Sequence, residues 1–264
     1  MSNSIRITRV DATSAVDAED VLVIEEPLEI RVSEKPVSVT LRTPGDDFDL
    51  AAGFLFSESI VRSASDIESI RHWGSPNVVR VALREGIRID LQRLQRHFYS
   101  TSSCGVCGKV SIDALRVQTS PIVSSMSVSR EAIVSLPATL RAAQKTFDTT
   151  GAIHAAGLFT PDGALLRMRE DVGRHNAVDK VIGSFLREGV ALDETILCVS
   201  GRASFEIVQK AIVARIPVLA AVGAPSSLAV ELAREFGLTL LGFVRDGRFN
   251  VYTPSPLPAA PRSE

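Results

Sequence analysis

Two cysteines three positions apart, Cys104 and Cys107, are the residues of this chain best suited to chemistry. They lie in a stretch of small and polar residues at positions 97–108, which predicts an exposed loop leading into a short helix near Lys109. A cysteine near a helix N-terminus gains thiolate character from the helix dipole, and Lys109 adds positive charge. The spacing therefore indicates a reactive dithiol that can accept a sulfur atom and pass it on.

The same spacing also fits half of a zinc site or a pair of unreactive thiols. The sequence holds no second C-x-x-C, and its four histidines lack the spacing of a zinc finger. A thioredoxin-type site would carry an aromatic residue before the first cysteine, but Ser103 stands there. The third cysteine, Cys198, lies in an apolar strand and is expected to be an inert core residue. An odd number of cysteines argues against a disulfide scaffold, so we expect a cytoplasmic protein.

Charged or small residues follow three successive predicted strands. The first such junction, 169–176, holds Arg174 and His175, and the second begins with Ser200, Gly201 and Arg202. A third lies at 223–227. Because strand ends in α/β sheets and helix N-termini favour anions, we expect the three junctions to line one ligand-binding edge of the sheet. Solvated helix caps and ordinary turns are the alternative interpretation.

Two further segments suggest a ligand site. His154 lies among small residues at 150–157, but Ala156 stands where a zinc deaminase of the H-x-E type has its glutamate, and the C-x-x-C precedes the histidine. A hydrogen-bonded structural histidine is an equally good interpretation. Arg245 and Arg248 flank a turn at Asp246-Gly247, which is either a ligand-contacting segment or an exposed hairpin.

The secondary-structure elements that must position these residues follow two different patterns, one before and one after about residue 150. Residues 1–90 alternate short β-like runs with turns: a hairpin joins 27–32 to 36–41, and 78–83 is expected to pair with 87–91. A helix after Ser129 is expected to be split by Pro137. From residue 151 strands alternate with helices, which predicts a mostly parallel sheet covered on both faces. The expected divisions are a β-rich part at 1–100, the dithiol loop and a short helix at 101–128, an α/β core at 129–253 and a disordered tail at 254–264.

Composition excludes two classes of partner. Lys and Arg number 29 and Asp and Glu 31, a net charge of -2, so we expect no general nucleic-acid binding. The longest apolar run, 211–224, is interrupted by Arg215 and Pro217, so we expect no membrane span, and the first 20 residues do not read as a secretory signal. We also expect no resident metal.

Together the motifs resemble those of the FdhD family, the formate dehydrogenase accessory sulfurtransferases. The resemblance covers nearly the whole chain. It rests on five motifs in order, at residues 103–109, 150–156, 170–180, 200–204 and 242–248.

The resemblance implies a sulfurtransferase that carries sulfur as a cysteine persulfide. The donor is a cysteine desulfurase, and the acceptor is the bis(molybdopterin guanine dinucleotide) molybdenum cofactor before its insertion into formate dehydrogenase. Cys104 is then the carrier of the sulfur and Cys107 its partner. The molybdenum cofactor is bound as the cargo of the protein, and GDP can mimic it. The implied fold is a cytidine-deaminase-like three-layer core in a homodimer. The cargo-binding residues are Phe243, Val244, Arg245, Asp246, Gly247, Arg248, His154, Arg174, His175, Ser200, Gly201 and Arg202. A cofactor-binding chaperone without sulfur transfer and a zinc-dependent deaminase-type hydrolase are the alternatives.

Overall fold

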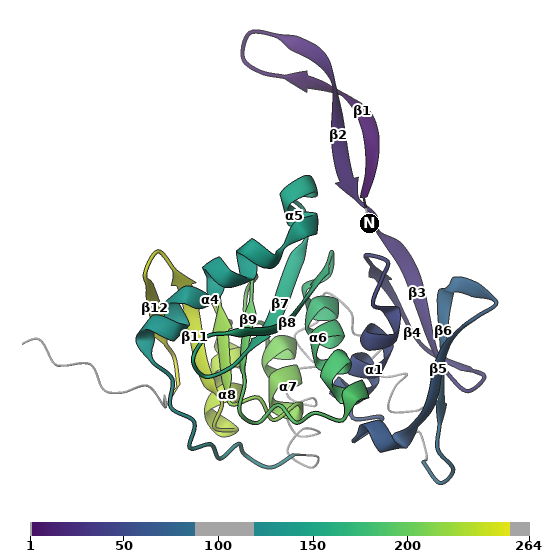
Figure 1. Ribbon diagram of the computed structural model, residues 1–264, viewed down its shortest axis with the longest axis vertical. Helices are drawn as coiled ribbons and strands as arrows, with labels where there is room; N and C mark the ends of the chain where they lie inside the picture. Colours follow the sequence, from purple (N-terminus) through teal and green to yellow (C-terminus); the bar gives the residue numbers. More distant parts are fainter. Residues whose placement is uncertain (1, 88–118, 254–264) are drawn as a thin grey trace, which may run out of the picture.

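The computed structural model describes residues 2–87 and 119–253, whose arrangement is shown in Figure 1. The expected dithiol loop at 97–108, with Cys104 and Cys107, lies outside the described residues, as does the tail at 254–264. The division expected at residue 100 falls in the same gap and stays a prediction. In the described part of the chain, no helix is both long and apolar enough to span a bilayer.

The N-terminal part contains two small sheets and a helix. Strands β1 (Ser2–Val10) and β2 (Ala15–Val23) form an antiparallel ribbon that projects from the body (Figure 1). A four-stranded sheet follows in the order β4-β3-β6-β5. Its strands are β3 (Glu26–Val32), β4 (Lys35–Arg42), β5 (Ile67–Trp73) and β6 (Ser75–Leu83), with helix α1 (Asp47–Ser57) after β4 and the short 3-10 helix η1 (Ala64–Asp66) before β5.

One of the two strand pairs expected in this part is confirmed and the other is wrong. The hairpin of β3 and β4 turns at Ser33, which adopts a left-handed φ of 54°. The partner of β6 is not 87–91, because β5 pairs with one edge of β6 and β3 with the other. Strand β5 is mostly exposed and therefore lacks the apolar alternation that would have marked it in the sequence.

The C-terminal part is a six-stranded sheet in the order β12-β11-β10-β9-β7-β8. Its strands are β7 (His154–Phe159), β8 (Leu165–Asp171), β9 (Ile196–Val199), β10 (Val218–Ala221), β11 (Thr239–Arg245) and β12 (Arg248–Val251). The helices are α4 (Arg130–Ala143), α5 (Lys145–Thr150), α6 (Arg174–Glu188), α7 (Phe205–Val213) and α8 (Ser227–Glu235).

Helices cover both faces of this sheet, as expected. Alternate residues of β9 show the two faces: Leu197 and Val199 belong to the apolar cluster under α6, α7 and α8, whereas Ile196 and Cys198 belong to the cluster under α4. Successive side chains of a strand point to opposite faces, so a strand between two helical layers must be apolar throughout. This is why β9 could be recognised in the sequence.

The sheet is mixed rather than mostly parallel. Strands β9, β10 and β11 pair in parallel, but β7 pairs antiparallel with both β8 and β9, and β12 pairs antiparallel with β11. Tight turns explain two of these antiparallel pairs, because a strand that returns after a few residues can only pair antiparallel with its predecessor. The β7–β8 and β11–β12 connections are both of this kind.

Helix α4 is not split at Pro137. It runs unbroken from Arg130 to Ala143, and its first turn is capped by Ser129, whose side chain accepts a hydrogen bond from the backbone N–H of Ala132. Proline removes one backbone hydrogen bond from a helix. The helix still packs Ile133, Leu136 and Leu140 fully into the sheet, and each such burial contributes about 1.5–3 kcal/mol.

The N-terminal part docks on the core through α1 and α6, which lie side by side in Figure 1. Their backbones approach so closely that a Cβ atom on Gly53 would lie 1.9 Å from the carbonyl oxygen of Asp179, and one on Gly183 would lie 1.9 Å from that of Asp49. Only glycine fits at these two positions. Buried charges add to the contact: Ser57 Oγ donates to Asp179 Oδ1 over 2.8 Å, and Lys210 Nζ pairs with the same carboxylate at 2.8 Å.

Candidate functional site

The three junctions after β8, β9 and β10 meet at one edge of the six-stranded sheet, as expected. The backbone N–H of Gly223 donates to the carbonyl oxygen of Gly201 over 3.0 Å, and that of Ala203 donates to Ala224 over 3.2 Å. Antiparallel β7 begins at the same edge, where the N–H of Ser200 donates to the carbonyl oxygen of Ala155 over 2.9 Å. The expected site residues on these loops are thus held in one hydrogen-bonded layer.

His154, Arg174 and Gly201 form the centre of this edge. A Cβ atom on Gly201 would lie 3.5 Å from His154 Nδ1 and 3.9 Å from Arg174 Cδ. Nε of Arg174 is buried and has no hydrogen-bond partner within the described residues. An unpaired buried donor is costly, so this guanidinium beside a helix N-terminus is prepared for an anionic ligand.

The loop that carries Arg174 is fixed by the buried carboxylate of Asp171. Its Oδ1 accepts from the backbone N–H of Gly173 at 2.8 Å and from Asn176 Nδ2 at 3.0 Å. Its Oδ2 accepts from the N–H of Thr43 at 3.2 Å and pairs with Lys180 Nζ at 2.7 Å. The N-terminal part therefore braces the start of α6 directly, and it holds Arg174 and His175 in position.

Two histidines at this edge are uncharged near neutral pH. Burial lowers the pKa of His154, and Arg174 lowers it further. Burial, reinforced by Lys210 and then Arg174, lowers the pKa of His175 to about 4. Nε2 of His175 lies 3.1 Å from Ser204 Oγ and 3.7 Å from Glu206 Oε2, and the second contact is no ion pair while the imidazole is neutral. Each neutral ring offers one nitrogen that donates and one that accepts a hydrogen bond.

Phe243 joins the layer through its backbone, because its N–H donates to the carbonyl oxygen of Gly223 over 3.1 Å. It has a φ of 52° at a register shift in β11. A non-glycine residue in the left-handed region costs about 1–3 kcal/mol, and such strain gathers at functional sites. Asp246 and Gly247 also have positive φ and form the tight turn to β12.

The remaining residues of the expected cargo segment divide between core and surface. Val244 is fully buried under α4, while the guanidinium of Arg245 lies 5.5 Å from the ring centre of Phe243 and is half exposed. Arg248 is exposed on β12, and Arg202 is exposed next to Gly201. The structure thus gathers His154, Arg174, His175, Ser200 and Gly201, and places Arg245 and Arg248 on the hairpin beyond Phe243.

Helices α4 and α5 form a wall of the site that sequence reasoning missed. A cavity of about 640 Å³ lies between Gln144 and Phe147 on this wall and His154, Ser200 and Val222 at the sheet edge. Glu170, which precedes Asp171 in β8, holds the start of α5 in place. Its carboxylate accepts hydrogen bonds from the backbone N–H groups of Thr146 and Phe147 at 3.0 and 3.1 Å. A glutamine between two helices carries no sequence signal of such a role.

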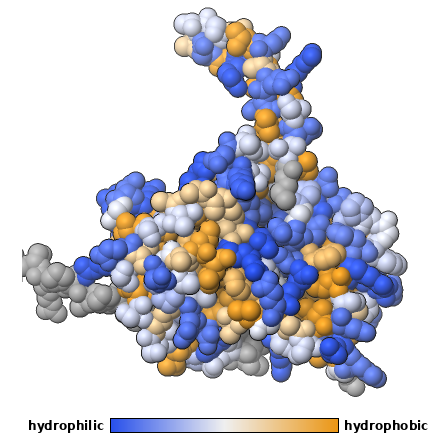
Figure 2. Space-filling view, in the orientation of Figure 1, coloured by the Kyte–Doolittle hydropathy of each residue, from blue (hydrophilic) through white to orange (hydrophobic). Residues whose placement is uncertain are grey.

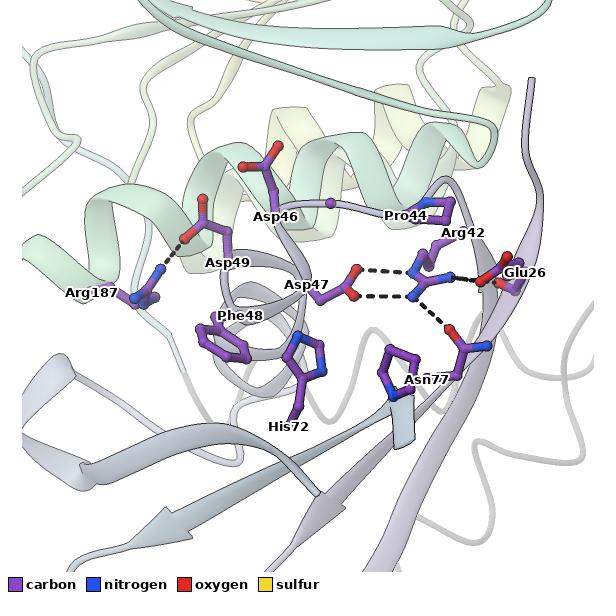
Figure 3. A pocket seen from close by; sticks show the side chains of 12 residues that line it. Glu26, Arg42, Pro44, Asp46, Asp47, Phe48, Asp49, His72, Asn77 and Arg187 are labelled. Atoms are coloured by element: carbon purple, nitrogen blue, oxygen red, sulfur yellow. Dashed lines mark hydrogen bonds and ion pairs between the residues drawn. The ribbon is translucent and has the colours of Figure 1, made fainter. Parts of the chain in front are cut away.

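A second cavity of about 410 Å³ lies between α1 and the four-stranded sheet (Figure 3). Arg42 dominates it and is bound on several sides: Nε and Nη2 donate to the two carboxylate oxygens of Asp47 at 2.9 and 3.0 Å, and Nη2 donates to Asn77 at 2.9 Å. Arg187 pairs with Asp49 at 2.5 Å in the same view. Because these charged groups already satisfy one another, we assign this cavity a structural role.

The two remaining chemical expectations concern Cys198 and zinc. Cys198 is fully buried, and burial raises the pKa of its thiol to about 12, which confirms it as an inert core residue. Ala156 is fully buried in β7 and offers no carboxylate two positions after His154. The proton shuttle of a deaminase therefore has no counterpart at that position.

Comparisons with known proteins agree over almost the whole chain. The model of the FdhD/NarQ family matches residues 23–256. A protein of Mycolicibacterium paratuberculosis named sulfur carrier protein FdhD is 51% identical, covering 94% of this chain and 95% of its own length. The protein of the same name from Streptomyces coelicolor is also 51% identical, over 94% of this chain and 92% of its own length.

A solved structure has the same fold. It is the crystal structure of a putative formate dehydrogenase accessory protein from Desulfotalea psychrophila, which superimposes with a TM-score of 0.79. The match covers 97% of this chain and 99% of the other, at 24% sequence identity.

Proposed function

This chain belongs to the FdhD/NarQ family, and from that premise we propose that it is a cytoplasmic sulfurtransferase that serves formate dehydrogenase. Sulfur arrives from a cysteine desulfurase, is held as a persulfide on Cys104, and passes to the bis(molybdopterin guanine dinucleotide) molybdenum cofactor. The observation that carries the proposal is the identity of about half of all residues, over 94% of the chain, with proteins named sulfur carriers. The cytidine-deaminase likeness of the core belongs to the same proposal and is supported by its two helical layers.

The chemistry of the dithiol needs no outside oxidant. The Cys104 thiolate attacks the outer sulfur of the desulfurase persulfide, and the desulfurase leaves as a thiolate, so one sulfur atom moves without net oxidation. When Cys107 attacks the inner sulfur of Cys104, a Cys104–Cys107 disulfide forms and hydrosulfide leaves. The dithiol supplies the two electrons that turn the carried sulfur into sulfide, and an external thiol reductant must restore it.

The site suits an anionic cargo. The cargo carries several phosphates, and Arg174 at the start of α6 has a buried Nε that no described residue pairs with, beside two neutral histidines. Arginine binds phosphate through charge-assisted hydrogen bonds, which are about twice as strong as neutral ones. Arg202 and Arg245 extend the positive charge along the same edge.

Nucleotide binding tests this placement of the cargo. GDP is expected to bind the wild-type protein, and an Arg248→Ala variant is expected to bind it at least about tenfold more weakly, since a hydrogen bond to a charged group is worth roughly 1.5–3 kcal/mol. Isothermal titration calorimetry measures the difference. Arg71→Ala on the exposed strand β5 is the control and should bind GDP as the wild type does. Equal affinity of the Arg248 variant would remove this residue from the site.

A chaperone that binds the cofactor without passing sulfur is the second candidate function. It is favoured by one observation, namely that the described residues of the arginine-bearing edge and its cavity offer charged and polar contacts to a ligand but no thiol. The two functions differ in what the cysteines must do, so cysteine variants separate them.

We also propose that the protein is a homodimer in which the ribbon of β1 and β2 contacts a second copy. The pairing register places Ile5, Ile7, Val16, Ala18 and Leu22 on one face of the ribbon. Of these, Ile5, Val16 and Leu22 are 37%, 54% and 45% exposed, and apolar atoms show along the projecting ribbon in Figure 2. An isolated two-stranded ribbon is marginally stable in water, so this face needs a cover.

The positions of two opposite charges on this face suit a second copy of the chain as the partner. Arg9 lies toward the tip of the apolar face and Asp20 toward its base. Two ribbons related by a two-fold axis near Ile7 and packed antiparallel bring each Arg9 toward the other copy's Asp20.

Charge reversal tests this arrangement. Arg9→Asp is expected to raise the dissociation constant of the dimer at least about tenfold, because like charges then meet across an apolar contact. The double variant Arg9→Asp, Asp20→Arg should restore the dimer. Sedimentation velocity measures both, and Arg6→Asp on the opposite face is the control. A dimer equally strong in all variants would place the interface elsewhere.

A further inference from the structure

The wall formed by α4 and α5 carries a buried side-chain amide, that of Gln144, whose donor is not accounted for by the contacts of the site. Gln144, between the two helices, is 3% exposed and lines the 640 Å³ cavity. Its Nε2 has no hydrogen-bond partner in the described part of the chain. Buried side-chain amides in native proteins are almost always satisfied, so an unpaired donor on a residue that lines a cavity indicates an acceptor that a ligand supplies.

The rest of the cavity defines the shape of that ligand. Pro137, Leu140, Phe147 and Val222 give it apolar walls, and His154 and Ser200 add polar groups on the side of the sheet edge. Apolar walls with a few convergent polar groups are typical of sites for flat heterocycles. The walls are also held in place, because Glu170 binds the start of α5 and the guanidinium of Arg141 lies 4.5 Å from the ring centre of Phe147.

We propose that this cavity is a subsite for the 2-amino-oxopyrimidine ring of the cargo, with Gln144 donating a hydrogen bond to the ring carbonyl. The inference rests on the proposed function, since it is this cargo that brings such rings to the site. Guanine and pterin share the ring, its carbonyl and the adjacent N–H. His154 lies across the cavity from Gln144, and a neutral imidazole there can accept from that N–H. Phe147 supplies an aromatic surface beside the ring.

Gln144 is thus a specificity-determining residue. Adenine carries an amino group where guanine carries the carbonyl, so with the amide oriented as in the structure it presents a donor to the Nε2 donor, and Gln144 must turn its amide over to pair with it. Sites built to hydrogen-bond one group reject the analogue that lacks it strongly. The cavity should therefore prefer GDP to ADP.

The test compares Gln144→Leu with the wild-type protein by calorimetry, with GDP, ADP and 6-hydroxymethylpterin as probes. The wild type is expected to bind GDP at least tenfold more tightly than ADP. The variant is expected to lose that preference while its affinity for ADP stays the same. Gln209→Leu on α7, away from the cavity, is the matched control and should keep the preference.

Thermal unfolding separates recognition from a structural role. Replacing an unpaired buried donor with an apolar side chain removes a cost, so ligand-free Gln144→Leu should melt at the same temperature as the wild type or higher. Lower melting with unchanged affinities for both GDP and the pterin would mean that Gln144 only supports the fold, and would overturn the subsite.

The probes also identify which ring occupies the cavity. Weaker binding of GDP alone in the variant assigns the cavity to guanine, and weaker binding of the pterin alone assigns it to the pterin. Unchanged affinity for both overturns the subsite, and so does a wild type that binds neither. Sulfur loading of Cys104, measured on the same proteins, keeps the two proposals apart. Normal loading without any effect at Gln144 refutes the subsite alone, whereas absent loading refutes the proposed function.

Discussion

A Cys104→Ala protein is expected to leave formate dehydrogenase inactive in cells that depend on this chain for sulfur transfer. An alanine cannot accept sulfur, and in this account Cys107 resolves the persulfide but does not take the place of Cys104 as its acceptor, so activation should fall at least about a hundredfold. The measurement is formate oxidation in extracts of cells whose own accessory gene is deleted and replaced by each variant.

Cys198→Ala is the matched control for this experiment. Its thiol is buried in β9 and has a pKa raised to about 12, so it is no nucleophile at neutral pH. The variant should activate formate dehydrogenase as the wild type does, provided that its expression is equal. Full activation by Cys104→Ala would favour the chaperone function instead.

The second large effect is expected at the buried pair of Lys180 and Asp171. Replacing Lys180 with methionine leaves the Asp171 carboxylate in the core without its cation, which costs about 3–5 kcal/mol. The two side chains are 1% and 0% exposed, so solvent cannot compensate. The midpoint of urea unfolding should fall accordingly, with an unchanged slope.

An exposed ion pair gives the control for the loss of Lys180. Arg141 and Asp148 pair at 2.6 Å but are 48% and 57% exposed, so Arg141→Met should change the free energy of unfolding by less than about 1 kcal/mol. A Lys180→Met protein as stable as the Arg141 variant would contradict the role of Asp171 as the brace between Thr43 and the start of α6.

The elements that could be predicted best from the sequence are those whose pattern of buried residues is regular along the whole element. Strand β9 is buried on both faces and reads as an apolar run, and α6 shows its buried face in the spacing of Ala177, Val181 and Ile182. Strand β5 is largely exposed, so it has no apolar pattern and was not predicted from the sequence. The mixed order of the sheet could not be predicted either, because it depends on which strands return through tight turns.

The candidate site was predictable where it depends on strand ends. Arg174, His175 and Gly201 follow strands directly, so the topology alone brings them together. Gln144 depends on how α4 and α5 lie over the sheet, and no local pattern encodes that contact. The uncharged state of His175 likewise arises from burial and from Lys210, which is 35 positions away in the chain.

The central claim, that Cys104 carries sulfur, is tested most directly by the intact mass of the protein after incubation with a cysteine desulfurase and cysteine. The wild type is expected to gain about 32 mass units, one sulfur atom, on the peptide that contains Cys104, and to lose them on treatment with a thiol reductant. Cys198→Ala should gain the same mass. A wild type that gains no mass but still activates formate dehydrogenase, or a Cys104→Ala protein that gains as much, would contradict the account.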